Sequence, residues 1–366
     1  IDNMHQHFKY LAIFAISVVL ILEYESISSI FVNSPTRTWR PNNSLKTILY
    51  WSPLFRQKDY YLGTGQEIFA HCQYKNCNAT YDRNSLPVDQ YDALIFHAPD
   101  YTTARYGKPE KRNPNQVYIF ANLESPDQTP VSIRDFNGFY NWTITYRSDS
   151  DIIRRYGLYR KQKTGYTVPS ATEIRNRKKK IAWFVSRCHA RSQREKLVDQ
   201  IKKVVPVDVY GSCGRLKCSV KNKEECYDMM EKQYKFYLSF ENSVCEDYVT
   251  EKMYNVLKRN IVPIVFGGAN YDVLAPPKSV INVLDFESVK NLTDYIKYLD
   301  AHPEEYLKYF EWKKDYVVDT SPKEVLCDLC KKLNEPRQTK VYGNIFTWWF
   351  GENVKKCFDN VILKIL

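Results

Sequence analysis

Short apolar runs separated by polar, turn-rich segments recur along this chain and become more regular in its second half. After Ser192, apolar residues at Leu197, Ile201 and Val204 share one face of an expected helix, and 250–259 has the same periodicity. Alternation of strands and helices is typical of a parallel sheet in a doubly wound domain. The strands expected from the apolar runs are 47–51, 91–97, 116–122, 143–146, 181–186, 207–210, 234–240, 261–266 and 280–284.

The length of 366 residues favours two domains. The segment 166–180 lacks apolar periodicity, so we interpret it as a hinge. The chain is therefore predicted to be an α/β protein with two Rossmann-like domains facing a cleft, where ligands normally bind. The expected parts are a tail with a membrane anchor at 1–22, a stem at 23–45, the domains at 46–165 and 181–335, and a C-terminal tail at 336–366.

The N-terminal region contains an apolar run, 10–22, that follows Lys9 and has no small-residue cleavage signal soon after it. With help from Phe8, this run predicts a signal anchor at 8–22, although it is shorter than the ~20 residues of a typical span. A cleaved signal peptide is the alternative. An anchor would place the body of the protein in the lumen of the secretory pathway, and four Asn-x-Ser/Thr sequons agree with this: Asn42, Asn78, Asn141 and Asn291.

Ten cysteines include three close pairs, Cys72/Cys77, Cys213/Cys218 and Cys327/Cys330. In an exported protein such cysteines are expected to form disulfides rather than a zinc site. Local pairs and cross-links from the end of the chain to the first domain are both compatible with the spacing.

Basic residues exceed acidic ones, which gives a net charge of +11. This charge permits a polyanionic partner, but the basic residues are scattered. The one dense run, 175–180, is interpreted as a solvated linker. Because no zinc-finger, RNP-type or helix-turn-helix pattern is present, we expect no nucleic-acid partner.

The segment 240–252 carries the strongest chemical signal. A strand ends there, a polar loop containing Asn242 follows, and Thr250 is positioned to cap the next helix. Glu251 and Lys252 then lie in the first turn. Unpaired backbone N–H groups and the positive end of the helix dipole attract phosphate, and Lys252 adds a full charge. The pattern predicts a nucleotide-sugar site, with Asn242 and Glu251 near sugar hydroxyls.

Three sequence segments, 239–243 (SFENS), 247–252 (DYVTEK) and 262–271 (VPIVFGGANY), resemble the signature of the α1,3-fucosyltransferase family. Further matches lie at 141–151, 183–186 and 207–211. The similarity is collinear from about Lys46 to Leu333 and is closest to invertebrate members. It implies the two-domain GT-B fold, GDP-fucose as donor and inversion at the anomeric carbon.

The resemblance also implies roles for individual residues. It assigns donor binding to Arg194, Asn242, Tyr248, Glu251 and Lys252. An inverting transfer needs a base that deprotonates the acceptor hydroxyl. Glu124, after an expected strand, matches the catalytic glutamate of the family, and His97 is the alternative base.

The triplet Asp149-Ser150-Asp151 resembles the motif that chelates a divalent cation in other transferases. It precedes the hinge and the resemblance assigns no metal to it, so we interpret it as a structural turn. No tightly bound cofactor is expected. The predicted reaction transfers fucose to the 3-position of GlcNAc on a glycan in the Golgi lumen, on either a core or an antennal, Lewis-type acceptor. The alternative is a catalytically inactive glycan- or nucleotide-binding relative.

Overall fold

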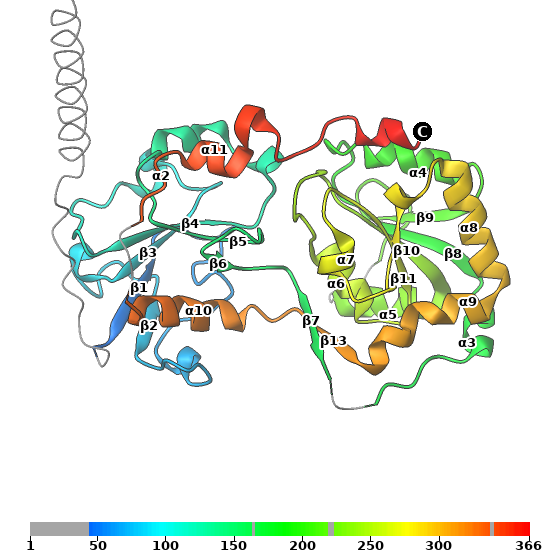
Figure 1. Ribbon diagram of the computed structural model, residues 1–366, viewed down its shortest axis with the longest axis horizontal. Coiled ribbons are helices and arrows are strands. Elements are labelled where there is room, and N and C mark those ends of the chain that lie inside the picture. The colour runs from blue at the N-terminus through cyan, green and yellow to red at the C-terminus, as the bar shows by residue number, and fades with distance from the viewer. Residues whose placement is uncertain (1–43, 163–164, 219–222, 337–339) are drawn as a thin grey trace, which may run out of the picture. The chain divides into compact units, whose positions relative to one another are not determined.

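The computed structural model describes residues 44–162, 165–218, 223–336 and 340–366, which form two parallel sheets covered by helices (Figure 1). The predicted anchor at 8–22, the predicted stem up to its last two residues and the sequon at Asn42 lie outside these residues. Among the helices that are described, none combines the length and apolar character needed to cross a membrane.

The first sheet has the strand order β2-β1-β3-β4-β5-β6, and all its pairings are parallel. Every side chain of β3 and β4 is buried, because helices and turns cover both faces of the sheet. The helix α10 packs on one face and α11 on the other. The bounds are β1 (Lys46–Tyr50), β2 (Cys77–Thr80), β3 (Ala93–His97), α2 (Thr103–Tyr106), β4 (Val117–Asn122), β5 (Trp142–Thr145), β6 (Ile152–Ile153), α10 (Lys323–Asn334) and α11 (Ile345–Phe350).

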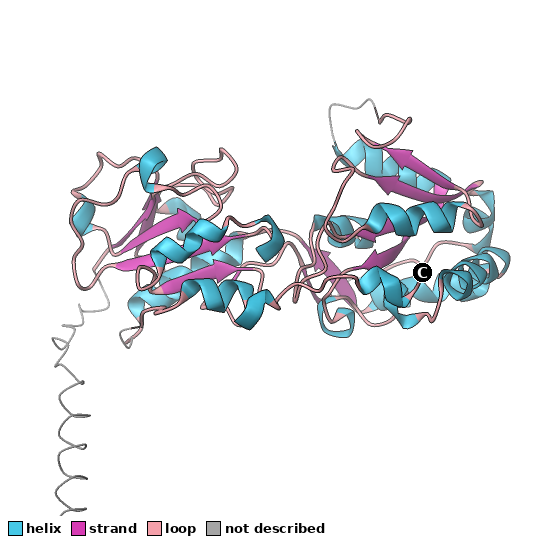
Figure 2. Ribbon diagram, turned by 90° about the horizontal axis from the view of Figure 1, so that it is seen from above, coloured by secondary structure: helices cyan, strands magenta, loops and turns pink. Residues whose placement is uncertain are grey.

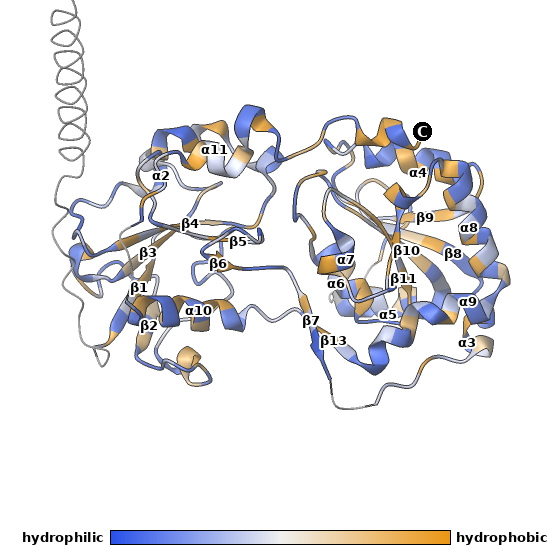
Figure 3. Cartoon of the chain, viewed as in Figure 1, coloured by the Kyte–Doolittle hydropathy of each residue, from blue (hydrophilic) through white to orange (hydrophobic). Residues whose placement is uncertain are grey.

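The second sheet has the order β12-β11-β10-β8-β9 and is also parallel. Its strands lie between helices in Figure 2, and Figure 3 shows apolar residues concentrated on the strands. The bounds are α3 (Ala171–Asn176), β8 (Lys179–Phe184), α4 (Arg194–Lys202), β9 (Val207–Tyr210), α5 (Lys223–Gln233), β10 (Tyr234–Phe240), α6 (Glu251–Leu257), β11 (Val262–Phe266), α7 (Tyr271–Leu274), β12 (Ile281–Asn282), α8 (Val289–Ala301) and α9 (Pro303–Leu307).

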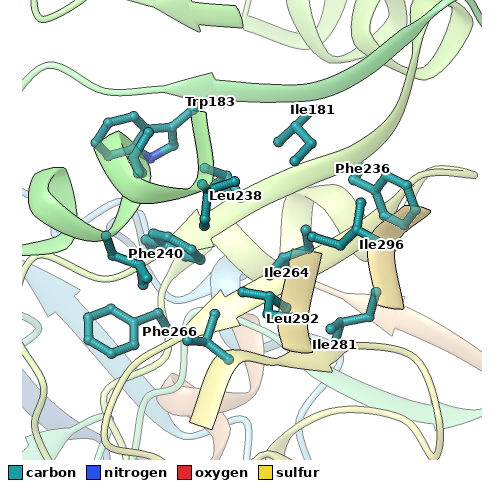
Figure 4. Close-up of a cluster of buried hydrophobic side chains, with 14 of the residues drawn as sticks. Ile181, Trp183, Phe236, Leu238, Phe240, Ile264, Phe266, Ile281, Leu292 and Ile296 are labelled. Atoms are coloured by element: carbon teal, nitrogen blue, oxygen red, sulfur yellow. The ribbon is translucent and has the colours of Figure 1, made fainter. Parts of the chain in front are cut away.

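The main core of this second sheet lies between its central strands and the helices α4 and α8. Ile181, Phe236 and Ile264 point from three neighbouring strands toward Leu292 and Ile296 of α8 (Figure 4). All five side chains are at most 1% exposed. Burial of this kind stabilises the fold by roughly 1.5–3 kcal/mol per side chain. It thereby fixes where the carboxyl ends of these strands lie.

The C-terminal part of the chain does not stay with the second sheet up to residue 335, where the sequence predicts the domain boundary. The helix α10 packs on the first sheet through Val325 and Leu329, although it follows the second sheet in sequence. An antiparallel pair, β7 (Leu158–Lys161) with β13 (Tyr316–Asp319), leads the chain back to the first sheet. Beyond 335, α11 joins the first core, and the 3-10 turn Val361–Lys364 joins the second.

The predicted hinge at 166–180 is also more structured than its sequence pattern indicates. It contains α3, whose Ile174 is fully buried in the core of the second sheet, and Lys179 already belongs to β8. Ser170 and Glu173 form a capping box at the start of the helix. Only one apolar residue of this short helix is buried, so no periodicity marks it.

All ten cysteines are paired. Cys72 bonds to Cys327 and Cys77 to Cys330, so the structure forms the cross-links and not the local pairs. Both bonds tie α10 to the first sheet across more than 250 residues, which constrains the unfolded chain strongly. Cys213 and Cys218 do not bond to each other; the remaining bonds are Cys188–Cys213, Cys218–Cys226 and Cys245–Cys357.

The buried Lys313 should make stability depend on pH. Its ammonium donates to Arg259 O at 2.6 Å and Asn260 Oδ1 at 3.1 Å, and burial lowers its pKa to about 7 from 10.5. Between these values the unfolded chain binds one more proton than the folded protein. The free energy of unfolding should therefore rise with pH by up to about 1.4 kcal/mol per unit from this group.

Lys313→Met removes this contribution. Both proteins can be unfolded with denaturant between pH 7 and pH 9.5. The free energy of unfolding of the wild type, relative to that of Lys313→Met, should increase as pH rises. Parallel stability curves would show that Lys313 keeps its ordinary pKa in the folded protein.

Candidate functional site

A cavity of about 490 Å³ opens at the carboxyl ends of β8, β9 and β10. This is the edge at which open parallel sheets bind ligands. Its walls contain four of the five predicted donor-binding residues, Arg194, Asn242, Glu251 and Lys252. The other lining residues are Phe184, Val185, Ser186, Arg187, Tyr210, Gly211, Cys218, Cys226, Tyr227, Tyr237 and Asn255.

Lys252 presents a cation at this cavity. Its Nζ lies 2.7 Å from Thr250 Oγ1, 3.0 Å from Glu241 Oε2 and 3.7 Å from Glu251 Oε1. Burial lowers the pKa of Lys252, but the carboxylates of Glu241 and Glu251 outweigh burial and raise it overall. Lys252 is therefore an ammonium at neutral pH.

Arg194 supplies a second cation from the first turn of α4 and is 3% exposed. Its Nη1 donates to Phe240 O at 2.6 Å and its Nη2 to Arg187 O at 3.3 Å. Burial lowers the pKa of Arg194, but an arginine remains charged at physiological pH.

Two buried polar atoms of cavity-lining residues lack a hydrogen-bond partner among the described residues: Arg194 Nε and Asn242 Oδ1. Buried polar atoms in folded proteins normally have partners. One donor and one acceptor are thus available to a polar ligand in the cavity.

The fifth predicted donor-binding residue, Tyr248, differs from the other four. It is 2% exposed and does not line the cavity. Its hydroxyl donates to Glu124 Oε2 at 3.3 Å, and burial raises its pKa well above the usual value, so it remains a donor. A further hydrogen bond at 2.9 Å joins Ser125 Oγ to Ser243 Oγ.

Of the two predicted bases, only Glu124 is accessible. It lies two residues after the end of β4, its N–H donates to Asn122 Oδ1 at 2.8 Å, and it is partly exposed. His97 is fully buried, and its Nδ1 lies 2.9 Å from Asp100 Oδ2. An acceptor sugar would need a rearrangement to reach His97.

The carboxylates of Asp149 and Asp151 are engaged by basic side chains. Arg147 Nε donates to Asp149 at 2.9 Å, and Lys340 Nζ to Asp151 at 3.0 Å. Tyr342 donates to Asp151 as well, at 2.8 Å. The triplet thus lies in a network that ties the C-terminal segment to the first sheet.

The three described sequons differ in their surroundings. Asn291 is exposed near the start of α8, and Asn78 is partly exposed on β2. The Asn141 amide donates to Lys340 O at 2.8 Å, and its oxygen accepts from the Tyr118 N–H at 2.8 Å. A glycan on Asn141 would disturb the bond to Lys340.

Sequence reasoning missed two features of the site, one behind the cavity and one in its wall. Glu241 was seen only as part of a motif, and the aromatic wall of Phe184, Tyr210, Tyr227 and Tyr237 was not foreseen. The abundance of tyrosine, 29 residues, is the available signal for that wall. It does not separate binding surfaces from cores.

Gly267, directly after β11, should not tolerate a side chain. A Cβ there would lie 2.5 Å from Tyr271 Oη, a buried atom without a partner among the described residues. Gly267→Ala should lower the free energy of unfolding by about 1–3 kcal/mol. Tyr271→Phe removes the clashing hydroxyl. The double variant should therefore lose less free energy of unfolding than the two single variants together. If Gly267→Ala costs the same with Tyr271 as with Phe at that position, the steric explanation is wrong.

A solved α1,3-fucosyltransferase structure, determined with GDP-fucose, matches this fold with a TM-score of 0.54. The match covers 84% of this chain and 95% of that chain at 21% identity, which supports the fold alone. The two parallel sheets, with a cavity at the strand ends of the second, therefore have the GT-B fold.

Sequence similarity identifies the family of this chain. Residues 43–157 match the model of the fucosyltransferase N-terminal domain, and 174–348 match that of the glycosyltransferase family 10 (fucosyltransferase) C-terminal domain. The chain therefore belongs to glycosyltransferase family 10, the fucosyltransferases. It is 37% identical to Drosophila melanogaster α-(1,3)-fucosyltransferase C, over 84% of this chain and 78% of that protein. Identity to glycoprotein 3-α-L-fucosyltransferase A of the same organism is 34%, over 86% of this chain and 62% of that protein.

Proposed function

We propose that this protein is an inverting α1,3-fucosyltransferase that moves L-fucose from GDP-fucose to the 3-position of GlcNAc on glycoprotein glycans. The observation that carries the proposal is the convergence of Arg194, Asn242, Glu251 and Lys252 on one cavity in a chain of this family. The names of the two Drosophila relatives support the α1,3 linkage, and one of them supports a glycoprotein acceptor.

The donor would bind with its diphosphate toward Arg194 and Lys252. GDP gains negative charge as it departs, and preorganised cations stabilise that charge in the transition state. Asn242 and Glu251 offer hydrogen bonds to ribose and fucose hydroxyls. Because two side-chain cations, Arg194 and Lys252, already face the cavity, the diphosphate would need no divalent cation there.

Glu124 would act as the general base. As the acceptor 3-hydroxyl attacks the anomeric carbon, its oxygen forms the new bond, the bond from that carbon to GDP breaks, and the proton passes to Glu124. Attack from the face opposite GDP inverts the configuration. Tyr248 would orient the carboxylate through its hydrogen bond.

The five disulfides support an oxidising compartment. We propose a single-pass type II protein of the Golgi membrane, anchored through 8–22, with its two domains in the lumen.

The test is to incubate the purified protein with GDP-fucose and a panel of core and antennal glycan acceptors. Fucose transfer to core GlcNAc alone or to antennal GlcNAc alone would identify the acceptor class. GDP binding without fucose transfer or GDP release for every acceptor would instead support a catalytically inactive relative.

A further inference from the structure

Glu241, the residue directly after β10, is a buried carboxylate behind the cavity and not one of its lining residues. It is 1% exposed. Its Oε1 accepts from the Thr250 N–H at 2.8 Å, and its Oε2 accepts from Lys252 Nζ at 3.0 Å. The Thr250 hydroxyl also donates to this carboxylate, at 2.9 Å. All of these donors belong to the start of α6.

A buried charge is strongly unfavourable unless it is paired and hydrogen-bonded. Both conditions are met here, since Glu241 has a cationic partner and further donors. Lys252 Nζ contacts two oxygens at hydrogen-bond distance, on Glu241 and Thr250, while the Glu251 carboxylate at 3.7 Å is too distant for a hydrogen bond. An ammonium has three donors, so the third remains for a ligand in the cavity.

We infer that Glu241 is a positioning residue of the donor site, which holds the Lys252 ammonium at the cavity wall so that one N–H meets the diphosphate of the nucleotide. This inference rests on the proposed use of GDP-fucose. Glu241 does not contact GDP-fucose itself and acts through Lys252.

The charges around Lys252 explain why a carboxylate is needed. Arg194 contributes a second positive charge, which together with burial opposes protonation of Lys252. Glu241 and Glu251 oppose that effect. Among the described residues, the other titratable groups that face this pair are tyrosines whose pKa values burial raises, so they stay neutral through the range tested: Tyr156, Tyr227, Tyr248, Tyr254 and Tyr271.

Glu241→Gln should therefore make GDP binding pH-dependent. Without the carboxylate, burial and Arg194 lower the pKa of Lys252, and the site loses its second cation as pH rises. Calorimetric titration with GDP should show the variant losing at least about tenfold more affinity than the wild type between pH 7 and pH 9. Because the variant and the wild type are compared at the same pH, changes in the ionisation of GDP affect both proteins equally.

A double-variant cycle separates this role from a structural one. In a Lys252→Met background, Glu241→Gln should leave both the GDP affinity and its pH dependence unchanged. A pH-independent loss that persists in that background would overturn the inference, because Glu241 would then only stabilise the start of α6. Glu195→Gln is the matched control: its carboxylate lies 3.7 Å from Arg194 Nε, and we expect no added pH dependence.

Glu241→Asp provides a second variant if the glutamine form does not fold. It keeps the charge with a shorter reach, so it should bind GDP more weakly with the pH dependence of the wild type. A pH dependence as steep as that predicted for the glutamine variant would contradict the inference. Failure of the wild type to bind GDP would instead refute the proposed function.

Discussion

Replacing Glu124 with glutamine is expected to lower the turnover number for fucose transfer by at least about 100-fold, since general bases contribute about 10²–10⁴-fold. Glutamine has the same shape and can still accept the Tyr248 hydroxyl, but it cannot take the acceptor proton. The affinity for GDP should stay near that of the wild type, because Glu124 does not line the donor cavity. Steady-state kinetics and GDP titration on the same preparation measure both quantities.

Asp127 provides the matched control for this experiment. It lies three residues further along the same loop, and its carboxylate lies 3.6 Å from Arg191 Nε. Burial raises the pKa of Asp127, which makes it the rival proton acceptor. Asp127→Asn should retain turnover. Normal turnover in Glu124→Gln, together with loss of turnover in Asp127→Asn, would transfer the base role to Asp127.

The central strands could be predicted from the sequence because parallel strands buried on both faces appear as continuous apolar runs. The ranges 207–210 and 234–240 coincide with β9 and β10. The strand β2 (Cys77–Thr80) was missed, because its four residues alternate between buried and partly exposed positions and contain no long apolar run. The role of α10 as a cover for the first sheet depends on a return of the chain that no local pattern encodes.

For a similar reason, only some residues of the candidate site could be predicted from the sequence. The local motif predicted Asn242, Glu251 and Lys252, the family resemblance implied Arg194, and these four residues line one cavity. The direction of the Tyr248 hydroxyl and the burial of Glu241 depend on tertiary packing. The disulfide partners could not be chosen either, because bond formation requires proximity in space rather than in sequence.

Replacing Arg194 with methionine is expected to lower the affinity for GDP by about 10- to 100-fold. Hydrogen bonds to charged groups contribute about 1.5–3 kcal/mol each, and the variant loses both the charge and the free Nε donor. It also removes the donor to Phe240 O, so thermal unfolding must be measured alongside GDP titration. Arg194→Lys keeps the charge but not the planar fork that joins Phe240 O to Arg187 O, so it should recover only part of the affinity.

Arg191→Met is the control for a general loss of positive charge in the same loop. Arg191 is exposed, pairs with Asp127 and is absent from the cavity lining. Screening by solvent weakens the effect of an exposed charge, so this variant should bind GDP nearly as the wild type does. Equal losses from Arg191→Met and Arg194→Met would mean that overall charge attracts the nucleotide. A loss confined to Arg194 variants that remain folded would identify Arg194 as a direct diphosphate ligand, because among the described arginines only this guanidinium combines burial, a cavity position and an unused donor.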